Sequence, residues 1–120
     1  MKKRVSALVL ALALLFSVSA AAATPRSKNP IDYVTSFTVN SSGAHCGVTI
    51  TAYNVSVSVS GTVTLYKDGK YLTSWSVSST SFSKTYTKNI TSGLYSMEYD
   101  LTVKGPYGTD SISGSVDYNY

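Results

Sequence analysis

Apolar and polar side chains alternate along much of this chain, and no stretch has the spacing of an amphipathic helix. The clearest case is residues 95–103, where Tyr, Met, Tyr, Leu and Val occupy every second position. Because successive side chains of a β-strand point to opposite faces, this pattern predicts a strand with one buried and one solvated face. We therefore expect an all-β fold.

Alternating runs of this kind recur from Tyr33 onward, and turn residues separate them at the spacing typical of a sandwich or barrel. About seven antiparallel strands predict a single two-sheet sandwich. In the fifth run, lysines at positions 84 and 88 share a face with aromatic residues, which is typical of an edge strand. The expected strands cover residues 33–39, 44–53, 55–66, 71–77, 82–88, 95–103 and 111–118.

The first 23 residues have the order of a secretory signal peptide: three basic residues, an apolar run, then small residues that end in alanines. The apolar run over residues 7–16 falls short of the roughly 20 residues that a membrane span needs. We expect cleavage after Ala23, a flexible leader over residues 24–32 and a domain over residues 33–120. The exported protein is then secreted, free outside the cell or associated with the cell wall, with no membrane segment.

Most of the formal charge of +4 belongs to the expected signal peptide. Beyond residue 23, seven basic and six acidic side chains remain, a formal charge of +1 with the basic residues dispersed. Such a chain lacks the electrostatic footprint of a nucleic-acid-binding protein. Cys46 is the one cysteine, so no disulfide can form within the chain. We expect Cys46 to be a small buried side chain, and pairing with a partner chain is the alternative.

Two segments resemble the immunoglobulin fold. Val63–Leu72 (VTLYKDGKYL) is similar to the hairpin between the third and fourth strands of many Ig-like domains, and Thr91–Met97 (TSGLYSM) to the tyrosine-corner motif. The resemblance implies that the Tyr95 hydroxyl bonds back to nearby backbone. Leu65 and Met97 stand where that family has tryptophan and its second cysteine. The chain as a whole resembles small secreted Ig-like sandwich proteins of Gram-positive bacteria.

No catalytic or metal motif stands out. His45 and Cys46 are neighbours on one expected strand and so point to opposite faces, which prevents a Cys-His pair. Glu98 and Asp100 share a face, but on the solvated side of a strand. A weak calcium site from Asp100, Asp110 and Asp117 is the alternative to ordinary solvated charges. We expect no enzyme activity, no resident metal and no cofactor.

Tyr66, Tyr71 and Trp75 are the candidate binding residues, and the register of their hairpin decides their role. With a two-residue turn at Asp68-Gly69, Tyr66 pairs with Tyr71, and all three aromatic side chains form an outer strip. With a three-residue loop, Tyr66 pairs with Lys70, and Tyr71 and Trp75 turn inward. We favour the inward register, because tryptophan is usually buried.

The sequence thus predicts a non-enzymatic binding module for an extracellular glycan or protein, and in the outward register the strip of Tyr66, Tyr71 and Trp75 would be its site. The alternative is a structural or self-assembling component of an extracellular matrix. A sandwich fold hosts unrelated functions, so the fold does not choose between the two. The oligomeric state stays open.

Overall fold

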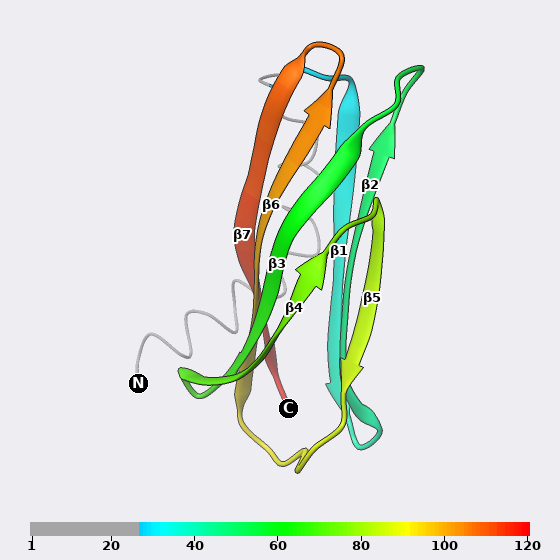
Figure 1. The fold of residues 1–120 in the computed structure, drawn as a ribbon. Coiled ribbons are helices and arrows are strands. Elements are labelled where there is room, and N and C mark those ends of the chain that lie inside the picture. The colour runs from blue at the N-terminus through cyan, green and yellow to red at the C-terminus, as the bar shows by residue number, and fades with distance from the viewer. Residues whose placement is uncertain (1–26) are drawn as a thin grey trace.

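The computed structural model describes residues 27–120, which form seven strands in two antiparallel sheets that pack face to face (Figure 1). The predicted signal peptide and its cleavage site after Ala23 lie outside the described residues. One sheet has the order β1-β2-β5 and the other the order β4-β3-β6-β7. The predicted all-β, two-sheet architecture is confirmed. The strands are β1 (Ile31–Asn40), β2 (Gly43–Ala52), β3 (Ser58–Lys67), β4 (Lys70–Val77), β5 (Ser81–Tyr86), β6 (Leu94–Gly105) and β7 (Gly108–Asn119).

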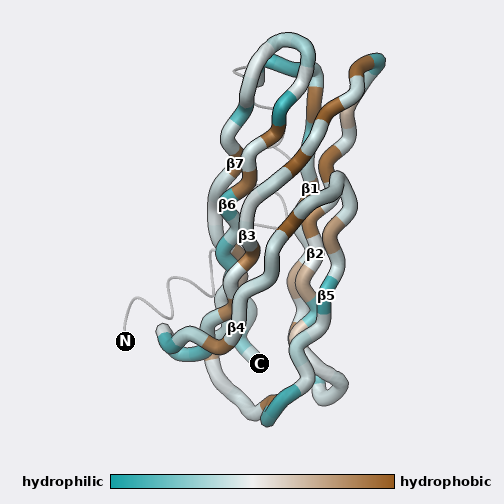
Figure 2. The backbone as a smooth tube through the Cα atoms, viewed as in Figure 1, coloured by the Kyte–Doolittle hydropathy of each residue, from teal (hydrophilic) through white to brown (hydrophobic). Residues whose placement is uncertain are grey.

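The core lies between the sheets and consists of the alternating apolar positions (Figure 2). Its fully buried side chains come from the middle of both sheets, which follows from the period-two pattern of each strand. Aromatic pairs join the sheets: Tyr33 meets Tyr99 at 6.0 Å and Phe37 meets Tyr118 at 6.4 Å between ring centroids. Six members of the core with almost no exposed surface are Val39, Val63, Leu65, Met97, Leu101 and Val103.

Two strand starts differ from the prediction by three residues, and the other boundaries agree to within two. β7 begins at Gly108 rather than at residue 111. β3 begins at Ser58 rather than at residue 55, because Asn54 takes a positive φ of 61° and interrupts the extended chain. β5 ends at Tyr86 rather than at residue 88. Its position at the edge of its sheet confirms the edge strand predicted from the two lysines.

The hairpin between β3 and β4 begins in the register of the two-residue turn and then leaves both predicted registers. Its turn has two residues, Asp68 and Gly69, so Tyr66 pairs with Tyr71 and the favoured three-residue loop is wrong. The pairing then shifts by one residue, and Trp75 pairs with Val63 on the inner side. A bulge inserts one extra residue into one strand, and the extra residue here, Leu72, lies in β4.

The bulge separates the three candidate aromatic side chains. Tyr71 is 61% exposed, whereas Trp75 is partly buried against the core, with its ring centroid 6.0 Å from that of Phe82. The inward placement of Trp75 therefore agrees with the structure, although the loop that was expected to cause it does not occur.

Replacing Trp75 with alanine should lower the free energy of unfolding by about 2–4 kcal/mol, because the variant loses a large, partly buried ring. Tyr71→Ala, on the same strand but exposed, is the matched control and should change stability by less than about 1 kcal/mol. Urea denaturation of both variants measures the difference. Equal midpoints would contradict the inward placement of Trp75.

Of the predicted flexible leader, residues 28–32 are held by the domain, and residues 24–26 lie outside the described residues. Ile31 and Asp32 already belong to β1, and Asn29 is 1% exposed. The Asp110 carboxylate accepts hydrogen bonds from the backbone N–H of Lys28 at 2.6 Å and of Asn29 at 3.0 Å, and from Asn29 Nδ2 at 2.9 Å. Sequence patterning missed this contact because it joins residues about 80 positions apart.

Asn29 and Asp110 form a buried polar cluster, and the remaining polar groups of the Asn29 side chain are also hydrogen-bonded within it. Asn29 Nδ2 also donates to the carbonyl of Gly108 at 3.0 Å, and Asn29 Oδ1 accepts from the backbone N–H of Tyr107 at 3.1 Å. A Cβ atom on Gly105 would overlap Asn29 Oδ1, so the glycine gives the amide room to reach the turn. The buried cluster thus ties the start of β1 to the turn between β6 and β7.

Asp110 should make the stability of the protein fall in acid. Burial alone would raise the pKa of its carboxyl, but the hydrogen bonds from Lys28 and Asn29 outweigh burial and lower the pKa below its ordinary value of 3.8. A carboxylate with a lowered folded pKa adds stability at pH values above its unfolded pKa. That contribution is lost as the pH falls through the folded pKa.

Asp110→Asn should therefore be less stable than the wild type by about 1–3 kcal/mol at pH 7, and the difference should shrink below about pH 4. Urea denaturation at pH 7 and pH 3 measures both values. Asp100→Asn, an exposed residue on the neighbouring strand, is the control. A difference between wild type and Asp110→Asn that is the same at both pH values would contradict the role of the carboxylate.

Candidate functional site

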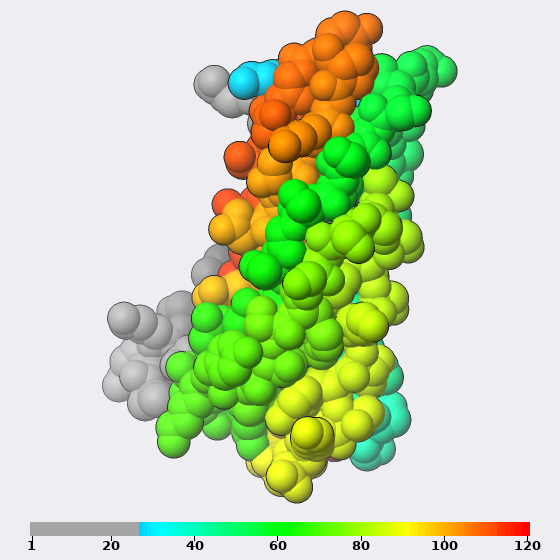
Figure 3. Space-filling view, in the orientation of Figure 1, coloured from blue at the N-terminus to red at the C-terminus, as the bar shows by residue number. Residues whose placement is uncertain are grey.

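The outer surface of the four-stranded sheet carries rows of short polar side chains. The inward positions of β3 and β6 hold Val63, Leu65 and Leu101, so the alternate positions point to solvent. Register places these outward side chains in rows that cross all four strands. We call this surface the hydroxyl face; two of its rows are Ser76-Thr62-Asp100-Ser113 and Ser74-Thr64-Glu98-Ser115. Figure 3 views the molecule from this side.

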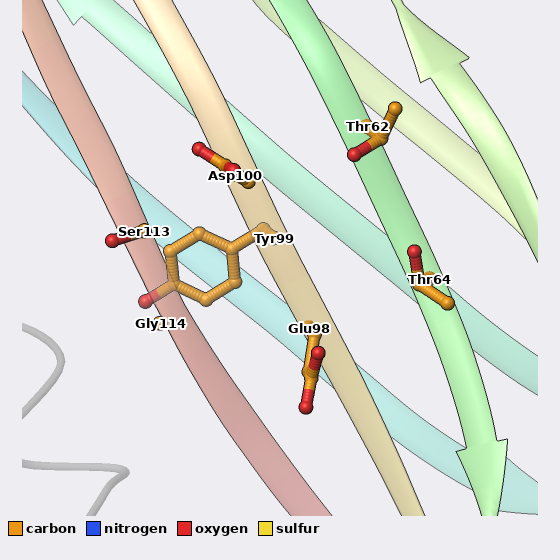
Figure 4. Close-up of a pocket in the computed structure, with 7 residues that line it drawn as sticks. All are labelled: Thr62, Thr64, Glu98, Tyr99, Asp100, Ser113 and Gly114. Atoms are coloured by element: carbon orange, nitrogen blue, oxygen red, sulfur yellow. The ribbon is translucent and has the colours of Figure 1, made fainter. Parts of the chain in front are cut away.

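A shallow hollow of about 340 Å³ lies in the middle of the hydroxyl face (Figure 4). Tyr99 and Gly114 are paired inward positions of β6 and β7, and the Tyr99 ring passes beside Gly114 on the core side of the sheet. A Cβ on Gly114 would lie 2.5 Å from the Tyr99 hydroxyl oxygen, so a larger residue would displace the ring. The hollow is lined by Thr62, Thr64, Glu98, Tyr99, Asp100, Ser113 and Gly114.

An aromatic pair borders this surface at the hairpin end. Tyr66 and Tyr71 lie next to each other with ring centroids 6.3 Å apart and an interplanar angle of 80°. Their row continues across the sheet to Ser96 and Asp117, which are joined by a 2.7 Å hydrogen bond from Ser96 Oγ to Asp117 Oδ1. Rows two residues apart are spaced by about 7 Å, so the tyrosine row lies next to the row of Thr64 and Glu98.

Two of the three predicted binding residues therefore share the hydroxyl face, and Trp75 does not. The structure also adds groups that the sequence did not single out as binding residues. These are the Ser and Thr side chains, which are common in strands, and the carboxylates of Glu98 and Asp100, which were interpreted as ordinary solvated charges. The signal was present as alternating Ser and Thr at positions 58–64 and as serines at 111, 113 and 115. Their alignment into rows depends on strand register, which composition does not reveal.

The opposite sheet holds the groups that a nucleophilic enzyme would need, but they lie apart. Cys46 is 2% exposed, and burial raises the pKa of its thiol to about 12, which keeps it protonated at neutral pH. His45 lies on the other side of the same strand, with Nδ1 3.1 Å from Thr85 Oγ1. The prediction that His45 and Cys46 point to opposite faces is confirmed.

His45 also contacts the hairpin between β1 and β2. Its Nε2 atom lies 3.0 Å from Ser42 Oγ, and Ser42 Oγ lies 2.5 Å from Asn40 Oδ1. Because an amide oxygen can only accept, the single Ser42 hydroxyl proton is donated to Asn40 in this arrangement. Asn40 Oδ1 also accepts from the backbone N–H of Ser42 at 2.8 Å, so the group caps the turn.

The acidic residues that were considered for calcium stand at separate positions along the sheet. Asp100 pairs with Ser113, whereas Asp117 pairs with Ser96, which lies four residues before Asp100 in β6. Asp110 is already bound by Lys28 and Asn29. Within residues 27–120, no group of three or more His, Cys, Asp or Glu side chains is placed to hold a metal ion.

Comparison of the chain with protein-family models, curated proteins and solved structures finds no match. The described part of the chain contains no helix long and apolar enough to cross a membrane.

Proposed function

We propose that this protein is a secreted, non-enzymatic recognition module with an Ig-like sandwich fold, and that its hydroxyl face binds an extracellular glycan. The observation that carries the proposal is the pair of the exposed Tyr71 and the partly exposed Tyr66 beside a shallow polar hollow. Secretion is inferred from the signal-like pattern of residues 1–23, and a bacterial cell wall is the expected location of the glycan.

Three features support the Ig-like assignment. The sheets contain three and four strands, and the Val63–Leu72 segment forms the third-to-fourth-strand hairpin that the resemblance implied. The Tyr95 hydroxyl donates to the carbonyl of Thr91 at 2.7 Å, which is the backbone bond expected of a corner tyrosine. Cys46 and Met97 stand at the two positions that the inter-sheet disulfide occupies in antibody domains, and both side chains are buried.

The chemistry of the hydroxyl face suits a sugar polymer. Tyrosine offers a flat apolar ring for the carbon-bound hydrogens of a sugar and a hydroxyl for hydrogen bonding. The Ser and Thr hydroxyls can both donate and accept, and the Glu98 and Asp100 carboxylates accept from sugar hydroxyls. A shallow hollow with convergent polar groups can hold a chain-like ligand that passes over the sheet.

Retention of the protein on extracellular material tests the proposal. All seven strands and all core residues lie within residues 31–119, so a polypeptide of residues 24–120 keeps the whole sandwich. We expect cell-wall polysaccharide to deplete this polypeptide from solution and Tyr66→Ala/Tyr71→Ala to abolish the depletion. Tyr107→Ala, a 66% exposed tyrosine in the β6–β7 turn, is the matched control and should be retained like the wild type.

Two outcomes would overturn glycan binding at this face. The first is an absence of depletion by any wall polysaccharide, and the second is equal depletion of wild type and Tyr66→Ala/Tyr71→Ala. If protease treatment of the wall abolished retention and purified polysaccharide did not bind the polypeptide, the ligand would be an extracellular protein instead. Circular dichroism of each variant checks that the sandwich is folded.

A second candidate function, self-assembly into an extracellular structure, is favoured by a different observation. It concerns the two flanks of the sandwich rather than the hydroxyl face.

A further inference from the structure

The two flanks of the sandwich carry opposite charges. One flank consists of the edge strands β1 and β7, which lie side by side and contain Asp32, Asp110 and Asp117 but no basic residue. The other flank consists of β4 and β5, which contain Lys70 and Lys84 but no acidic residue. Asp110 is held by Asn29 and lies near the positive charge of Lys28, so the free acidic charge of this flank belongs to Asp32 and Asp117, which keep part of their surface exposed.

The edge strand β7 is open to further pairing. It pairs with β6 over twelve consecutive positions without a bulge, and among residues 27–120 no strand pairs with its other side. Natural edge strands are often protected by bulges, lysines or prolines. β7 has none of these, whereas β5 is short and carries Lys84, and β4 has the bulge at Leu72.

Strand direction allows β7 of one copy to pair with β4 of another. All neighbours in the four-stranded sheet are antiparallel, so β4 and β7 at its two edges run in opposite directions. A second copy placed beside the first in the same orientation would therefore continue the sheet as an antiparallel ladder. The acidic flank of the first copy would then face the basic flank of the second.

We propose that copies of this chain associate head to tail, with β7 of one copy adding to β4 of the next in a continued antiparallel sheet. Both contacting surfaces are used once per copy and remain free at the ends, so the assembly is open and extends by further copies. Opposite flank charges steer the correct orientation and disfavour a two-fold contact between two acidic flanks.

The register of the joint follows from the rows within one copy. Ile112 shares a row with Val77, and Ser115 shares a row with Ser74. Continuing these rows places Ile112 beside Val77 of the next copy on the inner side, and Ser115 beside Ser74 of the next copy on the outer side. Apolar residues therefore meet apolar residues and hydroxyls meet hydroxyls across the joint.

The test uses charge pairs at the two outer serines. Sedimentation velocity of the 24–120 polypeptide over a wide concentration range should show species larger than dimers, which dissociate as salt rises. Ser74→Glu/Ser115→Glu places like charges across the joint and should weaken association at least about tenfold. Ser74→Lys/Ser115→Glu places opposite charges there and should restore or strengthen association.

The control variant is Ser60→Glu, an exposed position on the internal strand β3 that does not itself form the β7–β4 joint, and it should assemble like the wild type. Circular dichroism confirms that each variant folds. A wild type that stays monomeric at all concentrations overturns the proposal, and so does a closed dimer. Equal association of the Glu/Glu and Lys/Glu variants would overturn the β7–β4 joint.

Discussion

Gly61→Ala should lower the free energy of unfolding by more than about 3 kcal/mol, and we expect the variant to populate unfolded chain at room temperature. Gly61 lies in the central strand β3, paired with Val77 on one side and Leu101 on the other. Its φ of +147° is a conformation that residues with a side chain rarely adopt. A Cβ there would overlap the carbonyl oxygen of Asp100 and lie 2.8 Å from Leu101 Cα.

The neighbouring backbone cannot move away without breaking the hydrogen-bonded ladder between β3 and β6. The free-energy cost of the steric overlap therefore adds to the cost of the unfavourable φ. Gly47→Ala is the matched control, since Gly47 lies in the central strand of the other sheet and its Cβ would come no closer than 3.5 Å to Phe82 O. We expect Gly47→Ala to unfold within about 1 kcal/mol of the wild type in urea. A Gly61→Ala variant as stable as Gly47→Ala would contradict this account of β3.

Tyr95→Ala should cost about 3–5 kcal/mol, because it removes a large ring that is 1% exposed and leaves a cavity. The ring also lies 5.7 Å from the Lys67 ammonium, which in turn contacts Thr91. The Tyr95 hydroxyl donates to the carbonyl of Thr91 and accepts from its backbone N–H at 3.3 Å. The residue therefore joins β6, the β5–β6 connection and the β3–β4 hairpin.

Tyr95→Phe separates the ring from the hydroxyl and should cost about 1 kcal/mol, the net value of a typical hydrogen bond. Urea denaturation of Tyr95→Ala, Tyr95→Phe and the exposed control Tyr107→Phe gives the two contributions. If Tyr95→Phe were as damaging as Tyr95→Ala, packing of the ring would not be the main contribution. If Tyr95→Phe matched Tyr107→Phe, the bond to Thr91 would add nothing to stability.

The hairpin turn at Asp68 and Gly69 makes a second connection to the same region. The backbone N–H of Asp68 donates to the carbonyl of Leu94 at 2.7 Å, and Asp68 Oδ1 accepts from the backbone N–H of Leu94 at 3.0 Å. Asp68 and Gly69 both have positive φ, as a two-residue hairpin turn requires. The turn residues were readable in the sequence, whereas their bonds to β6 were not.

Local pattern was sufficient for the number of strands, most of their boundaries and the buried face of β6, because a period of two is a property of the strand alone. The Asp68-Gly69 turn was also identified, but the favoured loop length was wrong. The bulge at Leu72 explains this error. It allows an outward Tyr71 and an inward Trp75 in one strand, which a single uninterrupted register does not permit.

The candidate site was predictable only in part. Tyr66 and Tyr71 were identified from residue type, but the rows that place Thr64, Glu98 and Ser115 on one line depend on how three strands pair. Likewise, no local rule connects Asn29 with Asp110, because the contact closes a long loop between the start of β1 and the start of β7.

By itself, the sequence determined that this chain forms β-strands, where most of them turn and which face of most of them is buried, since alternation and turn chemistry act between neighbouring residues. Tertiary structure decided which strands are neighbours and in what register. It thereby placed the hydroxyl face, the oppositely charged flanks and the Asn29–Asp110 cluster. These features arise from residues far apart in the chain, and their contacts form only when the two sheets bury a common core.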